Sequence, residues 1–262
     1  MKQKANQSPM LIEERRQHIL SIIEKNGRVL VEELSDSLNL SKITIRKDLD
    51  YLESRNLLLR THGGALPKHT GTLVDPSFEE KTQLHHEEKL RIAAEAVKLV
   101  EEDQCIILDS GSTTIEIARA LKRFHRLTII TNALNIATEL VNTDFEVIIL
   151  GGSLRKKSFS VVGPLSEDML REFHADLLFL AVDGIDPKVG LTTPNMQESR
   201  VNRAMINAAD KVVAVCDSTK FERTSHSLIA GLEAVHQVIT DKGLPAEVGD
   251  AIRALGVELI LV

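Results

Sequence analysis

Residues 41–49 read Ser41-Lys42-Ile43-Thr44-Ile45-Arg46-Lys47-Asp48-Leu49. At about 100° per residue, a helix over this stretch places Ile45, Leu49 and the following Leu52 on one face, where they can pack inward. The opposite face carries Ile43, Thr44, Arg46 and Lys47. Cations, a hydroxyl and an exposed apolar group are what contacts phosphates, base edges and thymine methyls in a DNA major groove. The stretch therefore predicts a recognition helix over residues 42–55.

The neighbouring segments predict a winged helix-turn-helix around this helix. We expect helices at residues 12–25 and 31–38, joined to the recognition helix by a turn at 39–41 in which Ser41 is the N-cap. Segment 57–66 contains Arg60, His62 and a Gly-Gly pair and is typical of a β-hairpin wing. The predicted DNA contacts are Ser41, Lys42, Ile43, Thr44, Arg46, Lys47, Arg60 and His62.

The net charge of the 262-residue chain is −6, but the positive charge is concentrated near this motif. Residues 1–70 carry 12 Lys and Arg against 9 Asp and Glu, whereas residues 71–262 carry 20 against 29. A nucleic-acid footprint depends on such local charge. Trp is absent and Tyr51 is the only tyrosine, which argues against a stacking platform for single strands. Double-stranded DNA is therefore the predicted partner.

The composition is that of an ordinary globular protein, with 43% hydrophobic and 27% charged residues. No apolar run approaches the ~20 residues that span a bilayer, and the N-terminus has no signal-peptide core, so we expect a cytoplasmic protein with no membrane partner. Cys105 and Cys216 lie in apolar runs without metal-ligand spacing. They predict reduced thiols and no metal site.

Residues 67–78 contain Pro67, Gly71 and Pro76 without a clear period, and we interpret them as a linker. It would join a DNA-binding domain at 1–66 to a second domain at 79–262, whose first helix is expected at 85–100. Beyond residue 104, apolar runs alternate with amphipathic segments, which predicts an α/β domain with a largely parallel sheet covered on both faces. The predicted strands are 105–108, 127–130, 147–150, 177–182, 212–216, 235–239 and 259–262. The predicted helices are 113–122, 134–141, 165–173, 198–208 and 246–254.

Small, polar or charged residues follow five of these strands, at the sheet edge where open parallel sheets bind ligands. The sharpest is the loop Asp109-Ser110-Gly111-Ser112-Thr113-Thr114, which leads into a helix and offers backbone N–H groups and hydroxyls to an anion. It has no Walker lysine, which argues against a nucleotide triphosphatase. Further candidate ligand residues are Asn132, Gly151, Gly152, Arg155, Asp183, Glu198 and Lys220.

Each of these residues also has a purely structural interpretation. The loop at 109–114 could be an ordinary turn in which Ser and Thr are N-caps. Arg155 or Lys220 could neutralise a phosphate and Asp109 or Asp183 could accept sugar hydroxyls, but each could equally be a common turn residue. Glu198 is as well explained as a stabilising acid in the first turn of its helix. The place of Asp48, on the flank of the inward face of the recognition helix, favours an internal ion pair or a capping role over a base contact.

Two sets of motifs, in order along nearly the whole chain, resemble the DeoR family of bacterial transcriptional regulators. The first set is Arg16 with residues 41–49 and 60–65, and the second is 109–114, 131–132, 151–152, 163–164, 183–184 and 217–221. Residues 177–195, 202–203 and 256–262 are most similar to the branch that controls the catabolism of N-acetylgalactosamine and related amino sugars (AgaR-like). The resemblance implies a repressor whose sensor domain has the ribose-phosphate and glucosamine-phosphate isomerase fold and binds a phosphorylated sugar.

The main interpretation is therefore a ligand-controlled transcriptional repressor of a carbohydrate catabolic operon, with no enzymatic activity and no cofactor. Because helix-turn-helix proteins read symmetric half-sites as dimers, we expect a homo-oligomer. The alternative is a sugar-phosphate isomerase with an appended DNA-binding domain, for which Asp109, Asp183 and Glu198 are available bases. A third interpretation, a general nucleic-acid-binding structural protein, conflicts with the acidic second domain.

Overall fold

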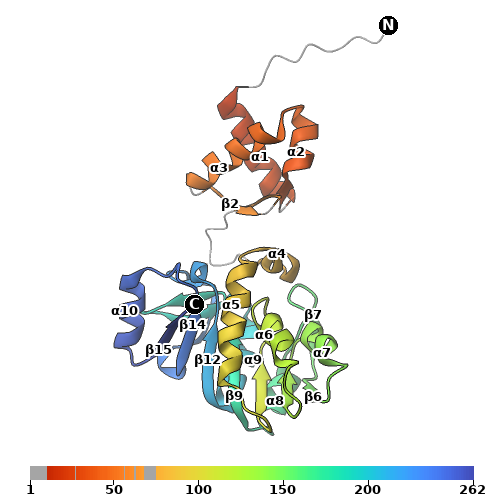
Figure 1. Ribbon diagram of the computed structural model, residues 1–262, viewed down its shortest axis with the longest axis vertical. Coiled ribbons are helices and arrows are strands. Elements are labelled where there is room, and N and C mark those ends of the chain that lie inside the picture. The colour runs from red at the N-terminus through yellow and green to blue at the C-terminus, as the bar shows by residue number, and fades with distance from the viewer. Residues whose placement is uncertain (1–10, 27, 56, 62, 68–74) are drawn as a thin grey trace. The chain divides into compact units, whose positions relative to one another are not determined.

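The computed structural model describes residues 11–26, 28–55, 57–61, 63–67 and 75–262. The chain separates into two units, residues 1–70 and residues 71–262, which we describe one at a time (Figure 1). Among the described helices, none combines the length and the apolar character needed to cross a bilayer.

The first unit has the predicted winged helix-turn-helix arrangement. Its described elements are α1 (Ile12–Asn26), β1 (Val29–Leu30), α2 (Val31–Leu38), α3 (Lys42–Ser54), β2 (Leu58–Thr61) and β3 (Gly64–Pro67). The inward-facing side chains of α1 and α3, among them Ile19, Ile45 and Leu49, are fully buried in one small core. The inward face predicted for α3 is confirmed.

The turn before α3 is set by two residues. Asn39 ends α2 in the left-handed conformation, with φ of 51°, which Asn tolerates better than most residues. Ser41 is the N-cap of α3, and its Oγ accepts a hydrogen bond of 3.1 Å from the N–H of Thr44. The cap fixes where α3 begins, and so which side chains face outward.

The sheet of this unit has the order β1-β3-β2, with antiparallel pairing. Arg60 of β2 pairs with Ala65 of β3 and Thr61 pairs with Gly64, which confirms the hairpin. A Cβ atom at Gly64 would lie 1.8 Å from the carbonyl oxygen of Val29, so only glycine fits where β1 pairs with β3.

The second unit contains a parallel sheet with the order β15-β14-β12-β9-β4-β5-β6 among its described residues. Its strands are β4 (Cys105–Leu108), β5 (Thr128–Thr131), β6 (Glu146–Ile149), β9 (Ala175–Ala181), β12 (Ala209–Val215), β14 (Gln237–Thr240) and β15 (Glu258–Leu261). All seven predicted strands are present, within three residues of the predicted bounds. The strand order reverses between β4 and β9, which makes this pair the topological switch point of the sheet.

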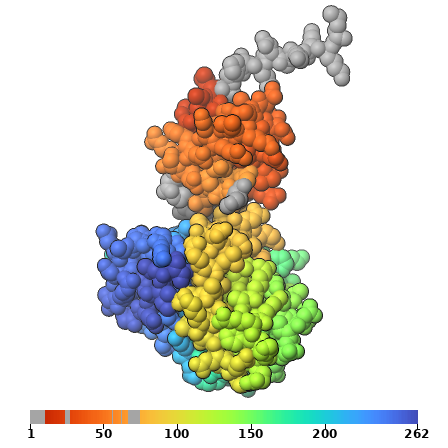
Figure 2. Space-filling model, in the orientation of Figure 1, coloured from red at the N-terminus to blue at the C-terminus, as the bar shows by residue number. Residues whose placement is uncertain are grey.

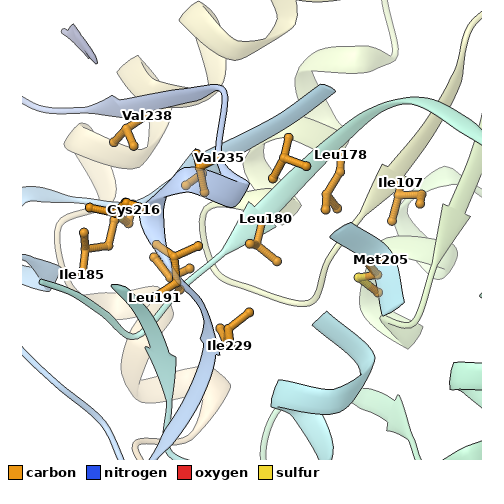
Figure 3. Close-up of a cluster of buried hydrophobic side chains, with 14 of the residues drawn as sticks. Ile107, Leu178, Leu180, Ile185, Leu191, Met205, Cys216, Ile229, Val235 and Val238 are labelled. Atoms are coloured by element: carbon orange, nitrogen blue, oxygen red, sulfur yellow. The ribbon is translucent and has the colours of Figure 1, made fainter. Parts of the chain in front are cut away.

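Helices cover both faces of the sheet, and strand residues alternate between the two. One face packs against α5 (His86–Ala96), α6 (Thr114–Leu121) and α7 (Leu134–Leu140), and the other against α8 (Pro164–Leu170), α9 (Met196–Asn207) and α10 (Ala246–Ala254). Figure 3 shows the second core, where Leu178 and Leu180 of β9 lie near Met205 of α9. In Figure 2, α5 (yellow) is at the surface, between α6 (green) and the C-terminal elements (blue). The predicted two-faced burial is confirmed.

Several short elements were not predicted from the sequence. They are α4 (Phe78–Gln83), the hairpin of β7 (Ser153–Arg155) and β8 (Ser160–Val162), and the small sheet of β10 (Gly184–Asp186), β11 (Gly190–Thr193) and β13 (Ser227–Ala230). The helix α4 begins with a capping box, in which Glu80 N–H donates to Ser77 Oγ and Ser77 N–H donates to Glu80 Oε2. Residues in or next to these elements lie beyond the carboxyl ends of β4, β9 and β12 in the large sheet.

Candidate functional site

The outer face of α3 is the candidate DNA-binding surface. Ile43 is 64% exposed although it is a large apolar side chain, and Arg46 and Lys47 are also exposed. Within the described part of the chain, neither Arg46 nor Lys47 forms an ion pair, whereas Lys42 pairs with Glu32 of α2. Ser41 and Thr44 are engaged in the cap, with 2.9 Å between their hydroxyl oxygens. The face thus presents two free cations around one exposed apolar group.

Asp48 fixes α3 against α1 and takes no part in this face. Its carboxylate is buried, and it accepts hydrogen bonds from Arg15 Nε at 2.6 Å and Arg16 Nε at 3.1 Å. The guanidinium of Arg16 also lies 3.5 Å from the centre of the Tyr51 ring, a cation–π contact. The internal ion pair predicted for Asp48 is confirmed, and it accounts for Arg15 and Arg16 as well.

The wing contributes one described candidate. Arg60 donates from Nε to Asp50 at 2.9 Å and from Nη1 to the carbonyl oxygen of Gly64 at 2.6 Å. Its guanidinium is therefore held within the unit, at the end of β2. His62 lies outside the described residues.

The candidate ligand site of the second unit is a small cavity of about 60 Å³, open to solvent, beyond the carboxyl ends of β4, β9 and β12. Its predicted lining residues are Asp109, Ser110, Gly111, Ser112, Thr113, Asp183, Glu198 and Lys220. Five successive positions come from the loop between β4 and α6, which follows the strand at the switch point. The structure thus brings together residues that are more than one hundred positions apart.

The loop at 110–114 presents unpaired backbone donors. The N–H of Ser110 donates to the carboxylate of Asp109 at 2.7 Å, but the N–H groups of residues 111–113 have no acceptor among the described residues. They stand at the N-terminus of α6, where the helix dipole favours an anion. Gly111 permits this loop, because a Cβ atom there would lie 2.6 Å from the Cβ atom of Ala181 on β9. These N–H groups can donate hydrogen bonds to the oxygens of a phosphate.

Cations and carboxylates meet around the same cavity. Lys81 of α4 donates to Asp183 at 2.6 Å, and Thr193 Oγ1 donates to the other oxygen of that carboxylate at 3.1 Å. Arg155 lies behind the lining, bonded to Asp75 and, at 3.3 Å, to Glu198. Lys220 forms no ion pair within the part of the chain that the structure describes. It is therefore the lining cation most available to a ligand.

Two carboxyl groups of the site have strongly shifted pKa values in opposite directions. Burial raises the pKa of Asp109 to about 8, although the N–H groups of Ser110 and Ala181 act against the shift. Burial would also raise the pKa of Asp183, but the nearby cations of Lys81 and Lys220 outweigh it and lower that pKa to about 2. Asp183 is therefore a fixed anion, and Asp109 is the carboxyl group of the pair that is largely protonated near neutral pH.

Other predicted ligand residues lie off the cavity. Asn132 is buried, and its Oδ1 has no partner among the described residues, but it does not line the cavity. Thr114 is fully buried, and its hydroxyl donates to the carbonyl oxygen of Gly111 at 3.1 Å. Gly151 and Gly152 shape the turn into β7, and at Gly152 (φ of 141°) a Cβ atom would lie 2.6 Å from the carbonyl oxygen of Val162. These four residues, like Arg155, lie outside the lining of the cavity.

Sequence reasoning missed several lining residues. They are Pro76, Phe78, Lys81, Lys157, Ser158, Thr193 and Asn202. Three of them lie in or beside the segment interpreted as a linker, whose residues 75–78 belong to the second unit. The sequence signal that could have found α4 is Ser77 followed three residues later by Glu80, the pattern of a capping box. Within the described residues, no group of three or more His, Cys, Asp or Glu side chains is placed to hold a metal ion.

Comparison with known families identifies both units. Residues 15–70 match the DeoR-like helix-turn-helix domain, and residues 84–242 match the DeoR C terminal sensor domain. Together the two matches cover most of the chain.

The chain is also similar over nearly its whole length to named regulators. It is 39% identical to a protein of Escherichia coli O157:H7 named as the proposed transcriptional repressor of the aga operon, over 95% of this chain and 93% of that one. It is 38% identical to the regulator GlpR of Haloferax volcanii, over 96% and 98% of the two chains. It is 33% identical to the glycerol-3-phosphate regulon repressor of Escherichia coli K12, over 90% and 93%.

Solved structures with a similar arrangement of elements include a D-ribose-5-phosphate isomerase in complex with phospho-erythronic acid. The sequence identity is 18%, the match covers 52% of this chain and 54% of that one, and the TM-score is 0.40.

Proposed function

The chain belongs to the DeoR family of transcriptional regulators, and from that membership we propose that it is a sequence-specific repressor of a carbohydrate catabolic operon. A phosphorylated sugar bound at the carboxyl edge of the sensor sheet controls its DNA binding. The protein acts in the cytoplasm as a homo-oligomer that reads two half-sites. The amino-sugar branch is supported by the named aga operon relative.

One observation carries the effector part of this proposal. Three successive backbone N–H groups, at residues 111–113, have no acceptor among the described residues and stand at the N-terminus of α6, in a cavity that Lys220 also lines. A phosphate dianion satisfies such donors and is favoured by the helix dipole and the lysine. The carboxylates of Asp183 and Glu198, on other parts of the lining, can accept hydrogen bonds from sugar hydroxyls or an amino group.

For DNA, the proposal assigns the major groove to the outer face of α3. Arg46 and Lys47 neutralise phosphates or contact base edges, and Ile43 contacts a thymine methyl. The wing, with Arg60 and His62, lies next to the flanking backbone or minor groove. The hydrogen bonds of Arg60 to Asp50 and Gly64 support a positioning role for its side chain.

We infer a binding role rather than catalysis for the sensor carboxylates. A proton-transfer isomerase needs a base whose pKa suits its operating pH. The pKa of Asp183, about 2, makes it a weak base, and Glu198 is bound to Arg155 and Ser160. The buried carboxyl group of Asp109, with a pKa of about 8, is largely protonated near neutral pH and so is not available there as a base. Turnover assays with ribose 5-phosphate and glucosamine 6-phosphate test this inference, and a rate that Asp183→Asn abolishes would contradict it.

The function is tested by fluorescence anisotropy with labelled DNA from the region upstream of the chain's own gene, at fixed salt. We expect tight binding that unlabelled random DNA does not displace. Sugar phosphates are then added one at a time, each with its unphosphorylated form as control. Release by one phosphorylated amino sugar alone supports the proposal, and specific binding that no sugar phosphate changes would contradict the effector assignment.

A further inference from the structure

The helix α4 and the residues just before it form part of the wall of the ligand cavity. Pro76, Phe78 and Lys81 line the cavity. None of the three lies in a family match, because the helix-turn-helix match ends at residue 70 and the sensor match begins at residue 84. Membership of the family therefore does not account for the part of the site that α4 contributes.

Contacts from outside α4 fix it in this wall at both ends. At its start, the N–H of Phe78 donates to the carbonyl oxygen of Lys157 at 2.8 Å, and the Phe78 ring packs edge-on against Phe159, with 5.7 Å between ring centres. At its other end, the buried ammonium group of Lys89 on α5 donates to the carbonyl oxygen of Lys81. The side chain of Lys81 therefore reaches the cavity from a backbone that is held in place.

Lys81 is a charged group with donors to spare. Burial disfavours its ammonium form, but the carboxylates of Asp183, Glu198 and Asp75 outweigh burial and raise the pKa of Lys81. Its Nζ donates to Asp183 at 2.6 Å, and this is its one hydrogen bond to the described residues. Because an ammonium group has three donors, two remain for a ligand.

A second lysine lies on the same side of the charge balance. Lys220 also lines the cavity, and like Lys81 it lowers the pKa of Asp183. The two lysines and this one carboxylate leave one positive charge in excess. The free N–H groups at residues 111–113 belong to the same cavity, which holds only about 60 Å³, so an anion on the loop lies close to both ammonium groups.

We propose that α4 is a fixed wall of the effector site and that Lys81 binds the anionic group of the effector, together with Lys220 and the loop at 111–113. The inference rests on the proposed function and adds a specificity-determining residue to it. The loop N–H groups can bind any small anion, whereas two nearby ammonium groups favour a dianion over a monoanion. Lys81 thus selects a phosphate monoester over the monoanion of a sugar acid.

The test uses the full-length chain with inorganic phosphate as the probe, titrated by isothermal titration calorimetry at constant ionic strength. Lys81→Gln removes the charge, and Lys81→Arg retains it. Lys98→Gln removes an exposed lysine, which pairs with Glu95 at 2.6 Å, and is the matched control. Loss of a charge-assisted contact should raise the phosphate Kd of Lys81→Gln about tenfold or more. Lys81→Arg should keep most of the affinity, and Lys98→Gln should match the wild type.

Acetate, a monoanion, is titrated in parallel to measure selectivity. The ratio of the acetate Kd to the phosphate Kd should fall in Lys81→Gln, and an equal loss of both anions would overturn the selective role of Lys81. A phosphate Kd equal to that of the wild type overturns the inference and leaves the rest of the proposed site intact. A wild type that binds no phosphate contradicts the proposed effector class as well.

Lys81→Gln leaves the carboxylate of Asp183 without its ion-pair partner, which can prevent folding. In that case Lys81→Gln is combined with Asp183→Asn and compared with Asp183→Asn alone, so that no carboxylate is left unpaired. The same increase in the phosphate Kd is expected between these two proteins, and an unchanged Kd overturns the inference.

Discussion

The arginines of the DNA-binding unit differ in whether their side chains already form an ion pair within the protein. Arg15 and Arg16 are committed to the buried carboxylate of Asp48, whereas Arg46 forms no ion pair within the described residues. A cation that already has a buried partner loses that partner's attraction when it turns to DNA. Arg46 and Lys47 carry no such cost and are the side chains to test first.

Arg46→Ala should reduce the preference for operator over random DNA. The loss should be about 1–3 kcal/mol if the guanidinium makes a bidentate contact with a base. Competition binding with both DNAs at one salt concentration measures it, and Arg91→Ala, an exposed arginine of the sensor unit, is the control. An equal loss on both DNAs would instead make Arg46 a phosphate contact.

Lys47→Ala should weaken binding to operator and to random DNA alike. A lysine that neutralises one phosphate releases about one counterion, so the slope of log K against log salt should become shallower by roughly 0.9. Binding isotherms at four or more salt concentrations give this slope. A slope equal to that of the wild type would show that Lys47 makes no phosphate contact.

At the scale of elements, α4 is joined to α5 by the buried side chain of Lys89. Its Nζ donates to the carbonyl oxygens of Lys81 and, at 2.6 Å, Leu84, which close the C-terminal end of α4. Burial lowers the pKa of Lys89 to about 8. The folded protein therefore loses this proton at a lower pH than the unfolded chain does.

The wild type should gain stability relative to Lys89→Met as the pH rises from about 8 toward the unfolded value of 10.5. In that range the unfolded chain holds one more proton than the folded protein, so the free energy of unfolding increases with pH. The total increase is about 3 kcal/mol. Below pH 8 the amine is protonated in both states, and the difference should be constant. Urea unfolding of both proteins at several pH values measures it, and a flat difference up to pH 10 would contradict the buried amine.

The sequence predicted the long, periodic elements and missed the short ones, for a physical reason. The strands β4 and β9 are largely apolar runs because their side chains are buried on both faces of the sheet. The amphipathic helices that alternate with the strands in the sequence indicate the same arrangement. The helix α4 has six residues and no buried side chain, so it has no apolar stripe to detect. Asp75 therefore lay in an apparent linker and Lys81 just beyond it. Their partners Arg155 and Asp183 are distant in sequence, so no local pattern pairs them.

At the scale of the whole molecule, the proposed function assigns the effector to one unit and DNA to the other, which predicts that induction is separable from DNA binding. Thr113 lines the cavity and is nearly buried, at 6% exposure, in the unit that does not contain α3. Thr113→Val should leave operator affinity unchanged and abolish release by the effector. The anisotropy assay with the effector titrated to saturation measures both, with Thr143→Val as control. Normal release would contradict the phosphate-binding role of the loop.

The cation–π contact between Arg16 and Tyr51 has a practical consequence for following the two units one at a time. The chain contains no tryptophan, and Tyr51, on α3, is its only tyrosine. Intrinsic tyrosine fluorescence therefore originates wholly in the DNA-binding unit, and loss of the Arg16 contact on unfolding changes its intensity. An unlabelled sample thus contains a built-in optical probe of one unit, while circular dichroism of the same sample is dominated by the larger one.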